Sequence, residues 1–264
     1  MLPPINKNTN GSANAFPKLP AGHKLGVGTI WMGRPWPMDN QNYFSPNEAE
    51  VNAFLLTAYQ AGIKHFDTAA AYGMAEQRLG QFLNQHPEVV EDREVQIATK
   101  WGEEWTPEAG SIMDNSLANC RASFARSLNC LPRIDVLYFH KPTVEALGNN
   151  EIRSVIEWWQ GIGLIKYSGV SVSNPDLLSQ LWDAKLLWPD WLQISSRVIW
   201  NNEPLVKDIA ESGKRIVVNA PVRAMPEGKT AKEAYQELAA KPYVSTVLTG
   251  TRYHLLETIG YFSD

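Results

Sequence analysis

The chain has 264 residues, of which 44% are hydrophobic and 20% are charged. This composition excludes a wholly disordered chain and is sufficient for a large core. A formal net charge of −4 gives no electrostatic reason to bind nucleic acid or an anionic membrane. No apolar run approaches the roughly 20 residues of a membrane span. Two cysteines are too few for a disulfide framework or a zinc site, so we expect a reducing, cytoplasmic location.

The N-terminal segment differs in composition from the rest of the chain. Residues 1–23 are rich in Asn, Pro, Gly and Lys and lack the basic and apolar regions of a signal peptide. We therefore predict a mobile or loosely docked arm over residues 1–23. One domain is expected to follow over residues 24–264.

Eight short apolar runs, rich in Val, Ile, Leu, Tyr and Phe, follow the arm and are typical of strands buried on both faces. They span residues 24–29, 64–68, 95–100, 134–140, 166–171, 191–195, 215–219 and 245–249. Segments with helical spacing lie between them. This alternation predicts a (β/α)8 TIM barrel. An open doubly wound sheet is the alternative, but its dinucleotide fingerprint is absent, because Trp31 stands where the third glycine is required.

Helix signals support the alternation. Ser45 is the predicted N-cap of the first helix, with Pro46 at its first position, and Gly62 can end that helix. Asn174 is predicted to cap a later helix in the same way. Further helices are expected at 76–85, 114–129, 150–160, 203–212 and 230–240.

Polar residues occur where the predicted strands end. In a barrel the carboxyl ends of the strands meet at one rim, where active sites are built. Asp67, Lys100 and His140 end the second, third and fourth strands, and Tyr72 follows in the second loop. Such a set suits proton transfer, with the Lys100 ammonium expected to lower the pKa of the Tyr72 phenol. Taken singly, each residue also fits an ordinary role as a cap, a packed core residue or a solvated side chain.

The motifs around these residues resemble those of the aldo-keto reductase superfamily. The segment from Gly62 to Gly73 is similar to the family's G-x-x-x-F-D-T-A…Y-G signature, and Thr99-Lys100 matches its T-K at strand three. His140-Lys141-Pro142 is similar to its H-x-P. The resemblance extends from about Leu25 to Glu257, and the order and spacing of the motifs make it specific.

The resemblance implies NADP(H)-dependent reduction of an aldehyde or ketone, or the reverse oxidation, with NAD(H) less favoured. It implies that Tyr72 is the general acid, that Lys100 paired with Asp67 assists it, and that His140 orients the carbonyl. The small-molecule carbonyl or alcohol is the expected partner, and the oligomeric state is left open. The implied cofactor-binding residues are Thr29, Ser171, Gln193, Asn219, Gly250, Thr251 and Arg252.

The sequence departs from the family pattern at several cofactor positions. Val172 replaces the asparagine of the family's Ser-Asn pair, and no aromatic residue follows the seventh strand. Arg252 favours NADP(H) if it meets the 2′-phosphate, but it fits a solvated surface arginine equally well. The sequence ends soon after Glu257, which predicts a short final helix and an open pocket. These departures keep a second hypothesis open, in which the barrel is a nucleotide-sensing binding or regulatory subunit without turnover.

Two further expectations concern the loops. Tryptophans in predicted loops suggest an aromatic-lined mouth, although ordinary packing explains them nearly as well. They are Trp31, Trp36, Trp101 and Trp105. Glu103 and Glu104 are expected to be solvated surface charges. The five histidines lack metal-ligand spacing, and there is neither a nucleophile elbow nor a P-loop.

Overall fold

The computed structural model describes residues 17–36, 42–250 and 252–263. Eight parallel strands close into a barrel, which confirms the predicted (β/α)8 fold and excludes the open sheet. Each predicted apolar run overlaps one of these strands, with the bounds agreeing to within one or two residues. They are β1 (Leu25–Gly28), β2 (His65–Asp67), β3 (Gln96–Trp101), β6 (Val136–His140), β7 (Tyr167–Val172), β8 (Trp191–Ser195), β9 (Arg215–Asn219) and β10 (Val244–Thr249). Neighbours along the chain are neighbours in the barrel, and β10 pairs with β1.

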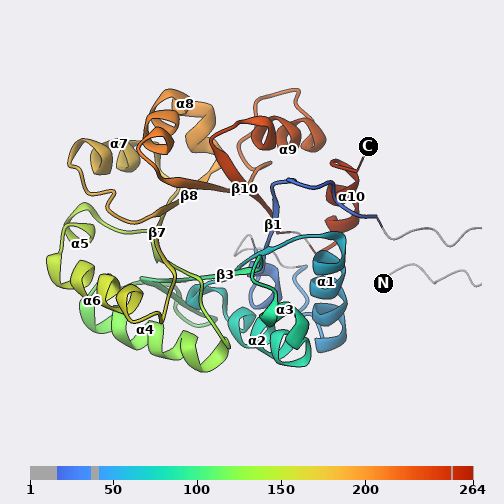
Figure 1. The fold of residues 1–264 in the computed structure, drawn as a ribbon, viewed down its shortest axis with the longest axis horizontal. Helices are drawn as coiled ribbons and strands as arrows, with labels where there is room; N and C mark the ends of the chain where they lie inside the picture. The colour runs from blue at the N-terminus through green and yellow to red at the C-terminus, as the bar shows by residue number, and fades with distance from the viewer. Residues whose placement is uncertain (1–16, 37–41, 251, 264) are drawn as a thin grey trace, which may run out of the picture.

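Helices surround the strands in the arrangement that Figure 1 shows. The α-helices are α1 (Glu48–Ala61), α2 (Ala75–Gln85), α3 (Pro87–Glu91), α4 (Leu117–Cys130), α5 (Val144–Leu147), α6 (Asn150–Gly161), α7 (Pro175–Asp183), α8 (Ser196–Glu211), α9 (Ala231–Ala240) and α10 (Leu255–Gly260). Two 3-10 turns, η1 (Ile30–Met32) and η2 (Ala70–Tyr72), follow β1 and β2. None of the helices in the described part of the chain combines the length and apolar character needed to cross a bilayer.

Helix boundaries differ from the sequence prediction at the starts of three helices. Helix α4 begins at Leu117, capped by Ser116, three residues after the predicted start at 114. Helix α1 is capped by Asn47, whose side chain accepts from the Glu50 backbone N–H while the Glu50 carboxylate accepts from Asn47, so the predicted cap at Ser45 is wrong. Helix α8 begins before the predicted segment and is broken at Asn202, which precedes Pro204. The predicted cap of α7 at Asn174 is confirmed.

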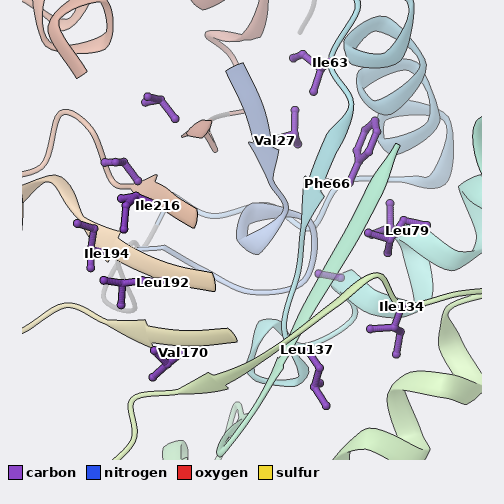
Figure 2. Packing of buried hydrophobic residues seen from close by; sticks show 14 of the residues in the cluster. Val27, Ile63, Phe66, Leu79, Ile134, Leu137, Val170, Leu192, Ile194 and Ile216 are labelled. Atoms are coloured by element: carbon purple, nitrogen blue, oxygen red, sulfur yellow. The ribbon is translucent and has the colours of Figure 1, made fainter. Parts of the chain in front are cut away.

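Apolar side chains fill the layer between the strands and the helices. Figure 2 shows part of this layer, to which Phe66, Leu137 and Ile194 contribute from three strands and Leu79 from α2. Because side chains alternate along a strand, the intervening residues point into the barrel. A smaller buried cluster comprises Ala98, Val136, Tyr138, Trp191, Val217 and Leu248. Further along the same strands the inward positions are polar, and these carry the site described below.

A two-stranded hairpin that the sequence analysis did not predict follows β3. Its strands are β4 (Glu103–Thr106) and β5 (Gly110–Met113), which pair antiparallel. Gly102 enables the turn into the hairpin, since its φ is +103° and an added Cβ would lie 3.0 Å from the His140 carbonyl oxygen. The hairpin therefore folds against the end of β6.

The predicted arm falls largely outside the described residues, which begin at 17. Its last part is docked, because the Leu19 N–H donates to the Ala61 carbonyl and the His23 ring hydrogen-bonds to the Gly62 carbonyl. Both contacts lie at the end of α1. The two cysteines, Cys120 and Cys130, are both on α4 and are free thiols.

Candidate active site at the carboxyl ends of the strands

The buried centre of the site is an ion pair between adjacent strands. Lys100 Nζ lies 2.5 Å from Asp67 Oδ2 and also donates to the Thr68 carbonyl at 2.8 Å. Lys100 has no solvent exposure, and burial of its charge is tolerated because both partners satisfy it. Gln193 Nε2 donates to the other Asp67 oxygen at 2.7 Å. The pKa of Lys100 is raised, since the Asp67 carboxylate and the Tyr72 phenol outweigh the effect of burial.

The Tyr72 hydroxyl lies against this ion pair. Its oxygen is 3.4 Å from Lys100 Nζ, and the ammonium also lies 4.9 Å from the centre of the Tyr72 ring. We expected Lys100 to lower the pKa of Tyr72, but the net shift is upward. Burial raises the pKa, and nearby Asp67 raises it further, so Lys100 compensates only in part. The phenol is therefore protonated at neutral pH and can act as a proton donor.

His140 completes the predicted group of four. Its ring meets the Tyr72 ring edge-on, with centroids 6.1 Å apart. Burial lowers the pKa of His140 well below its usual value, and the cations Lys100, Lys141 and Arg34 lower it further. The imidazole is therefore neutral at pH 7. The predicted proximity of Asp67, Tyr72, Lys100 and His140 is thus present in the structure.

Glu103 is a site residue that the sequence analysis missed, because it was assigned to the solvated surface. It is only 1% exposed. Its Oε1 accepts from Lys141 Nζ at 2.7 Å and from the Ser111 hydroxyl. Its Oε2 lies 3.1 Å from His140 Nδ1, without the alignment of a hydrogen bond. Lys141 neutralises much of the Glu103 carboxylate charge, which limits how far Glu103 raises the pKa of His140. Glu104, by contrast, lies in a partly exposed pair with Arg126, as expected for a surface charge.

Arg34 is a second missed residue and lies beside Tyr72. Its guanidinium carbon is 5.9 Å from the centre of the Tyr72 ring and 5.6 Å from the centres of both Trp36 and Trp105. Trp36 and Trp105, two of the tryptophans expected at the mouth, thus both lie near Arg34. The prediction is wrong for Trp101, which is a residue of β3 and stacks on Phe139 with centroids 3.9 Å apart, out of contact with solvent. Trp31 is likewise buried, against Phe54.

Three of the residues expected to hold a cofactor form a polar row along the rim. Ser171 and Gln193 are register neighbours on β7 and β8. Gln193 Oε1 accepts from the Ser171 hydroxyl at 3.2 Å and from Asn219 Nδ2 at 3.1 Å. Next to Ser171, Val172 is buried and offers no side-chain polar atom. The row therefore presents a hydroxyl and two amides, and the asparagine of the family's Ser-Asn pair is absent, as the sequence indicated.

The remaining cofactor candidates lie apart from this row or already have partners. The Thr29 hydroxyl is buried and donates to the Asp67 carbonyl at 3.1 Å, so it stabilises the loop after β2. Arg252 pairs with the Glu50 carboxylate and donates to the Phe44 carbonyl at 3.1 Å. Gly250 lies across from Gly28, where an added Cβ would be 3.6 Å from the Gly28 carbonyl oxygen. Thr251 lies outside the described residues.

A cavity of about 700 Å³ lies at the carboxyl end of β7, where Val172 lines it. Lys141 and Asn174 line it from the loops after β6 and β7, and Arg197 lines it from α8. Its walls thus carry two cations, of which Lys141 directly follows His140 in the chain. Within the described residues, no group of three or more His, Cys, Asp or Glu side chains is arranged to hold a metal ion.

Comparison with known proteins agrees with this geometry. The family model "Aldo/keto reductase family" matches residues 24–258. Two structures of a Pseudomonas aeruginosa protein described as an aldo-keto reductase have TM-scores of 0.74 and 0.73 and 25% identity. Each match covers 91% of this chain and 89% of that protein. An aldo-keto reductase from Bacillus halodurans, solved in its holo form, shares the fold with a TM-score of 0.71 at 21% identity, covering 91% of this chain and 87% of its own. A search of curated protein sequences gave no match.

The members of this family are oxidoreductases that act on carbonyl compounds and generally use nicotinamide cofactors. The match covers nearly the whole described barrel and includes the strand ends that carry Asp67, Lys100 and His140. By sequence and by fold, this chain belongs to the aldo/keto reductase family.

Proposed function

We propose that this protein reduces an aldehyde or ketone to an alcohol with NADPH, or catalyses the reverse oxidation, with Tyr72 as the general acid or base. One observation carries the proposal. The Tyr72 hydroxyl lies within hydrogen-bond distance of a buried Lys100–Asp67 pair and beside a neutral His140. This arrangement supplies a proton at the place where a carbonyl oxygen would gain negative charge.

The polar row of Ser171, Gln193 and Asn219 supports the cofactor assignment, because a hydroxyl and two amides match the donors and acceptors of a carboxamide. A bound reduced nicotinamide would supply the hydride to the carbonyl carbon. Ser171 and Asn219 would hold its carboxamide. Gln193 is itself fixed by Asp67, so the row is tied to the catalytic ion pair.

Proton movement in the reduction follows from the positions of the side chains. The Tyr72 O–H bond breaks and the proton passes to the carbonyl oxygen, while the carbonyl carbon accepts the hydride. Lys100 Nζ, 3.4 Å from the Tyr72 oxygen, stabilises the phenolate that remains, and solvent returns the proton afterwards. Neutral His140 can donate one ring N–H to the carbonyl oxygen and so fix its position. In the oxidation the Tyr72 phenolate accepts the proton from the alcohol.

The preference for NADP(H) over NAD(H) depends on Arg252. Its guanidinium is paired with Glu50, so a 2′-phosphate would compete with that carboxylate or share the arginine with it. Both Arg252 and Glu50 are half-buried, which leaves their side chains accessible from the rim. We therefore assign Arg252 to the 2′-phosphate and expect NADPH to bind more tightly than NADH.

Binding without turnover is the second candidate function. Val172 favours this second function, because the absence of an amide side chain at this position removes a hydrogen bond that would orient the nicotinamide ring. The intact and fully buried Lys100–Asp67 pair favours catalysis, since a binding role gives no reason to bury a charge beside Tyr72.

A nucleotide titration followed by an activity assay tests the proposal. We expect the protein to change the fluorescence of NADPH at lower concentrations than that of NADH. With 4-nitrobenzaldehyde as substrate it should then oxidise NADPH, and the loss of NADPH absorbance measures the rate. Nucleotide binding with no turnover on a broad panel of carbonyl compounds would favour the regulatory function. Absence of binding to both nucleotides would exclude the enzyme assignment.

A further inference from the structure

Arg34 is a buried cation that the proposed reaction does not use. Its side chain is only 2% exposed, although arginine is almost never buried without partners. Its Nε and Nη1 have no hydrogen-bond partner among the described residues. It has instead three aromatic neighbours, Tyr72, Trp36 and Trp105.

The aromatic rings stabilise the charge of Arg34 but do not satisfy its Nε and Nη1 donors. A ring face attracts a cation through its quadrupole, whereas the N–H groups of a guanidinium need acceptors in the plane of the fork. A buried donor without an acceptor carries a desolvation cost that a bound ligand would remove. The residue is therefore prepared to bind an acceptor that comes from outside the chain.

The backbone fixes Arg34 next to the reacting position. Gly33, the preceding residue, packs so closely on the loop after β2 that an added Cβ would lie 1.7 Å from the Tyr72 carbonyl oxygen. Gly73 approaches Gly33 from the other side, with an added Cβ 2.3 Å from the Gly33 carbonyl oxygen. Arg34 and Tyr72 therefore sit on two loops held in direct backbone contact. An anion on Arg34 would lie near the Tyr72 side chain, whose ring centre is 5.9 Å from the guanidinium carbon.

The charge around Arg34 also favours an anionic ligand. The Arg223 guanidinium carbon lies 5.2 Å from the centre of the Trp36 ring. Two guanidinium groups, those of Arg34 and Arg223, therefore lie near Trp36. Glu103 is the acid whose charge acts on Arg34, and its carboxylate already binds Lys141 and Ser111. Positive charge is thus in excess at this side of the rim, in a chain whose formal net charge is −4.

We propose that Arg34 binds a carboxylate on the substrate, so that the preferred substrates are aldehydes or ketones that carry a carboxylate a few bonds from the carbonyl group. This proposal rests on the proposed function for its reaction, but the anion site can be tested separately. A flat carboxylate matches the planar guanidinium, which lies 5.6 Å from the ring centres of both Trp36 and Trp105. A phosphate dianion would call for more donors than one arginine offers, and it is treated as an outcome of the test.

The kinetic test compares two aldehydes of similar size, 4-carboxybenzaldehyde and its neutral methyl ester. The ratio of their kcat/KM values with NADPH should favour the carboxylate in the wild-type protein. In Arg34→Met the ratio should fall about 10- to 100-fold, the range expected when one charge-assisted contact is lost. Arg34→Lys keeps the charge and should retain part of the preference. Arg126→Met removes an exposed cation paired with Glu104 and is the matched control, with no change in the ratio expected.

A binding test separates this site from the reaction. Titration of benzoate by calorimetry, with and without NADP⁺, should give a dissociation constant that rises about tenfold or more in Arg34→Met and stays unchanged in Arg126→Met. Titration of benzyl alcohol should not distinguish Arg34→Met from the wild type. Thermal unfolding of each variant shows whether it is folded. If Arg34→Met does not fold, the benzoate dissociation constant of Arg34→Lys is compared with that of the wild type instead.

The outcomes are distinguishable. If neither aldehyde is reduced but benzoate binds in an Arg34-dependent way, the proposed function fails and the anion site stands. If both aldehydes are reduced and their ratio is the same in all variants, the anion site is wrong and the proposed function stands. Benzoate binding that is absent, or unaffected by substitution of Arg34, also overturns the site. Weaker NADPH binding with unchanged NADH binding in Arg34→Met would assign Arg34 to the cofactor phosphate and overturn the proposal for the substrate.

Discussion

Gly33 packs directly on the backbone of Tyr72, so closely that any side chain at position 33 would overlap the Tyr72 carbonyl oxygen. This contact joins the loop after β1 to the loop after β2. Tyr72 is therefore held from two directions, by the Lys100 ammonium at its hydroxyl and by Gly33 at its backbone. The position of Tyr72, the proposed general acid, therefore depends on Gly33, which is distant in sequence and has no reactive side chain.

Gly33→Ala should destabilise the fold and reduce turnover. The new Cβ would lie 1.7 Å from the Tyr72 carbonyl oxygen and 2.5 Å from the Ala75 backbone nitrogen, so both loops must shift. We expect a loss of roughly 2–3 kcal/mol in the free energy of unfolding, as for overpacking in a core. Gly161→Ala is the control, because nothing lies within 4 Å of an added Cβ there and α6 should gain from alanine. Denaturant unfolding and turnover check both variants, and a Gly33→Ala protein as stable and active as the wild type would contradict the packing argument.

Tyr72→Phe should abolish turnover while leaving nucleotide binding nearly unchanged. The substitution removes the hydroxyl that donates the proton and keeps the ring that packs beside His140. General acid catalysis of this kind contributes about 10²- to 10⁴-fold, so kcat should fall by that factor. Tyr167→Phe, at the opposite end of the barrel, is the control and should keep wild-type kcat. Equal kcat in wild type and Tyr72→Phe would exclude Tyr72 as the proton donor.

The barrel fold could be predicted from the sequence because the patterns that indicate its strands and helices are local and repeat along the chain. Each strand is a short apolar run, and the polar residue at its end marks the rim, so the proximity of Asp67, Lys100 and His140 followed from topology alone. The roles of these residues remain predictions. The N-cap at Asn47 was missed because Ser45, with Pro46 after it, carries an equally good local signal.

Glu103 and Arg34 could not be predicted because their burial depends on contacts distant in sequence. Glu103 is covered once the hairpin folds against β6, and a glutamate in a polar loop gives no local sign of that. Arg34 is buried by aromatic rings from two other loops. The two signals in the sequence were Gly33 and Gly102, which stand next to the missed residues and permit backbone contacts that a side chain would prevent. The upward net shift in the pKa of Tyr72 was also missed, because the extent of burial is not visible in the sequence.

Stability should decrease in acid partly through His140. Its pKa is lowered in the folded protein, so the unfolded chain binds a proton that the folded protein resists. The contribution is therefore fully present above the unfolded pKa of about 6.5 and is lost as the pH falls from there toward the folded pKa. His140→Gln removes this term. As the pH falls from about 7 to about 5, the unfolding free energy of the wild type should decrease more than that of His140→Gln. Urea unfolding at several pH values measures it, and a constant difference over this range would show that His140 is not held neutral by burial.

Glu103 should act as a positioning residue for His140. Glu103→Gln keeps the shape of the side chain but removes the charge near His140 Nδ1 and weakens the bond to Lys141. We expect kcat to fall about tenfold because the ring is less well oriented, the size of effect seen when a histidine's supporting partner is lost. The pH profile of kcat should shift as well, which a purely structural change would not produce. Glu104→Gln is the matched control on the same hairpin, since Glu104 faces Arg126 at the surface, and it should leave both kcat and the profile unchanged. If Glu103→Gln changes only the unfolding free energy, Glu103 serves the hairpin and not the imidazole.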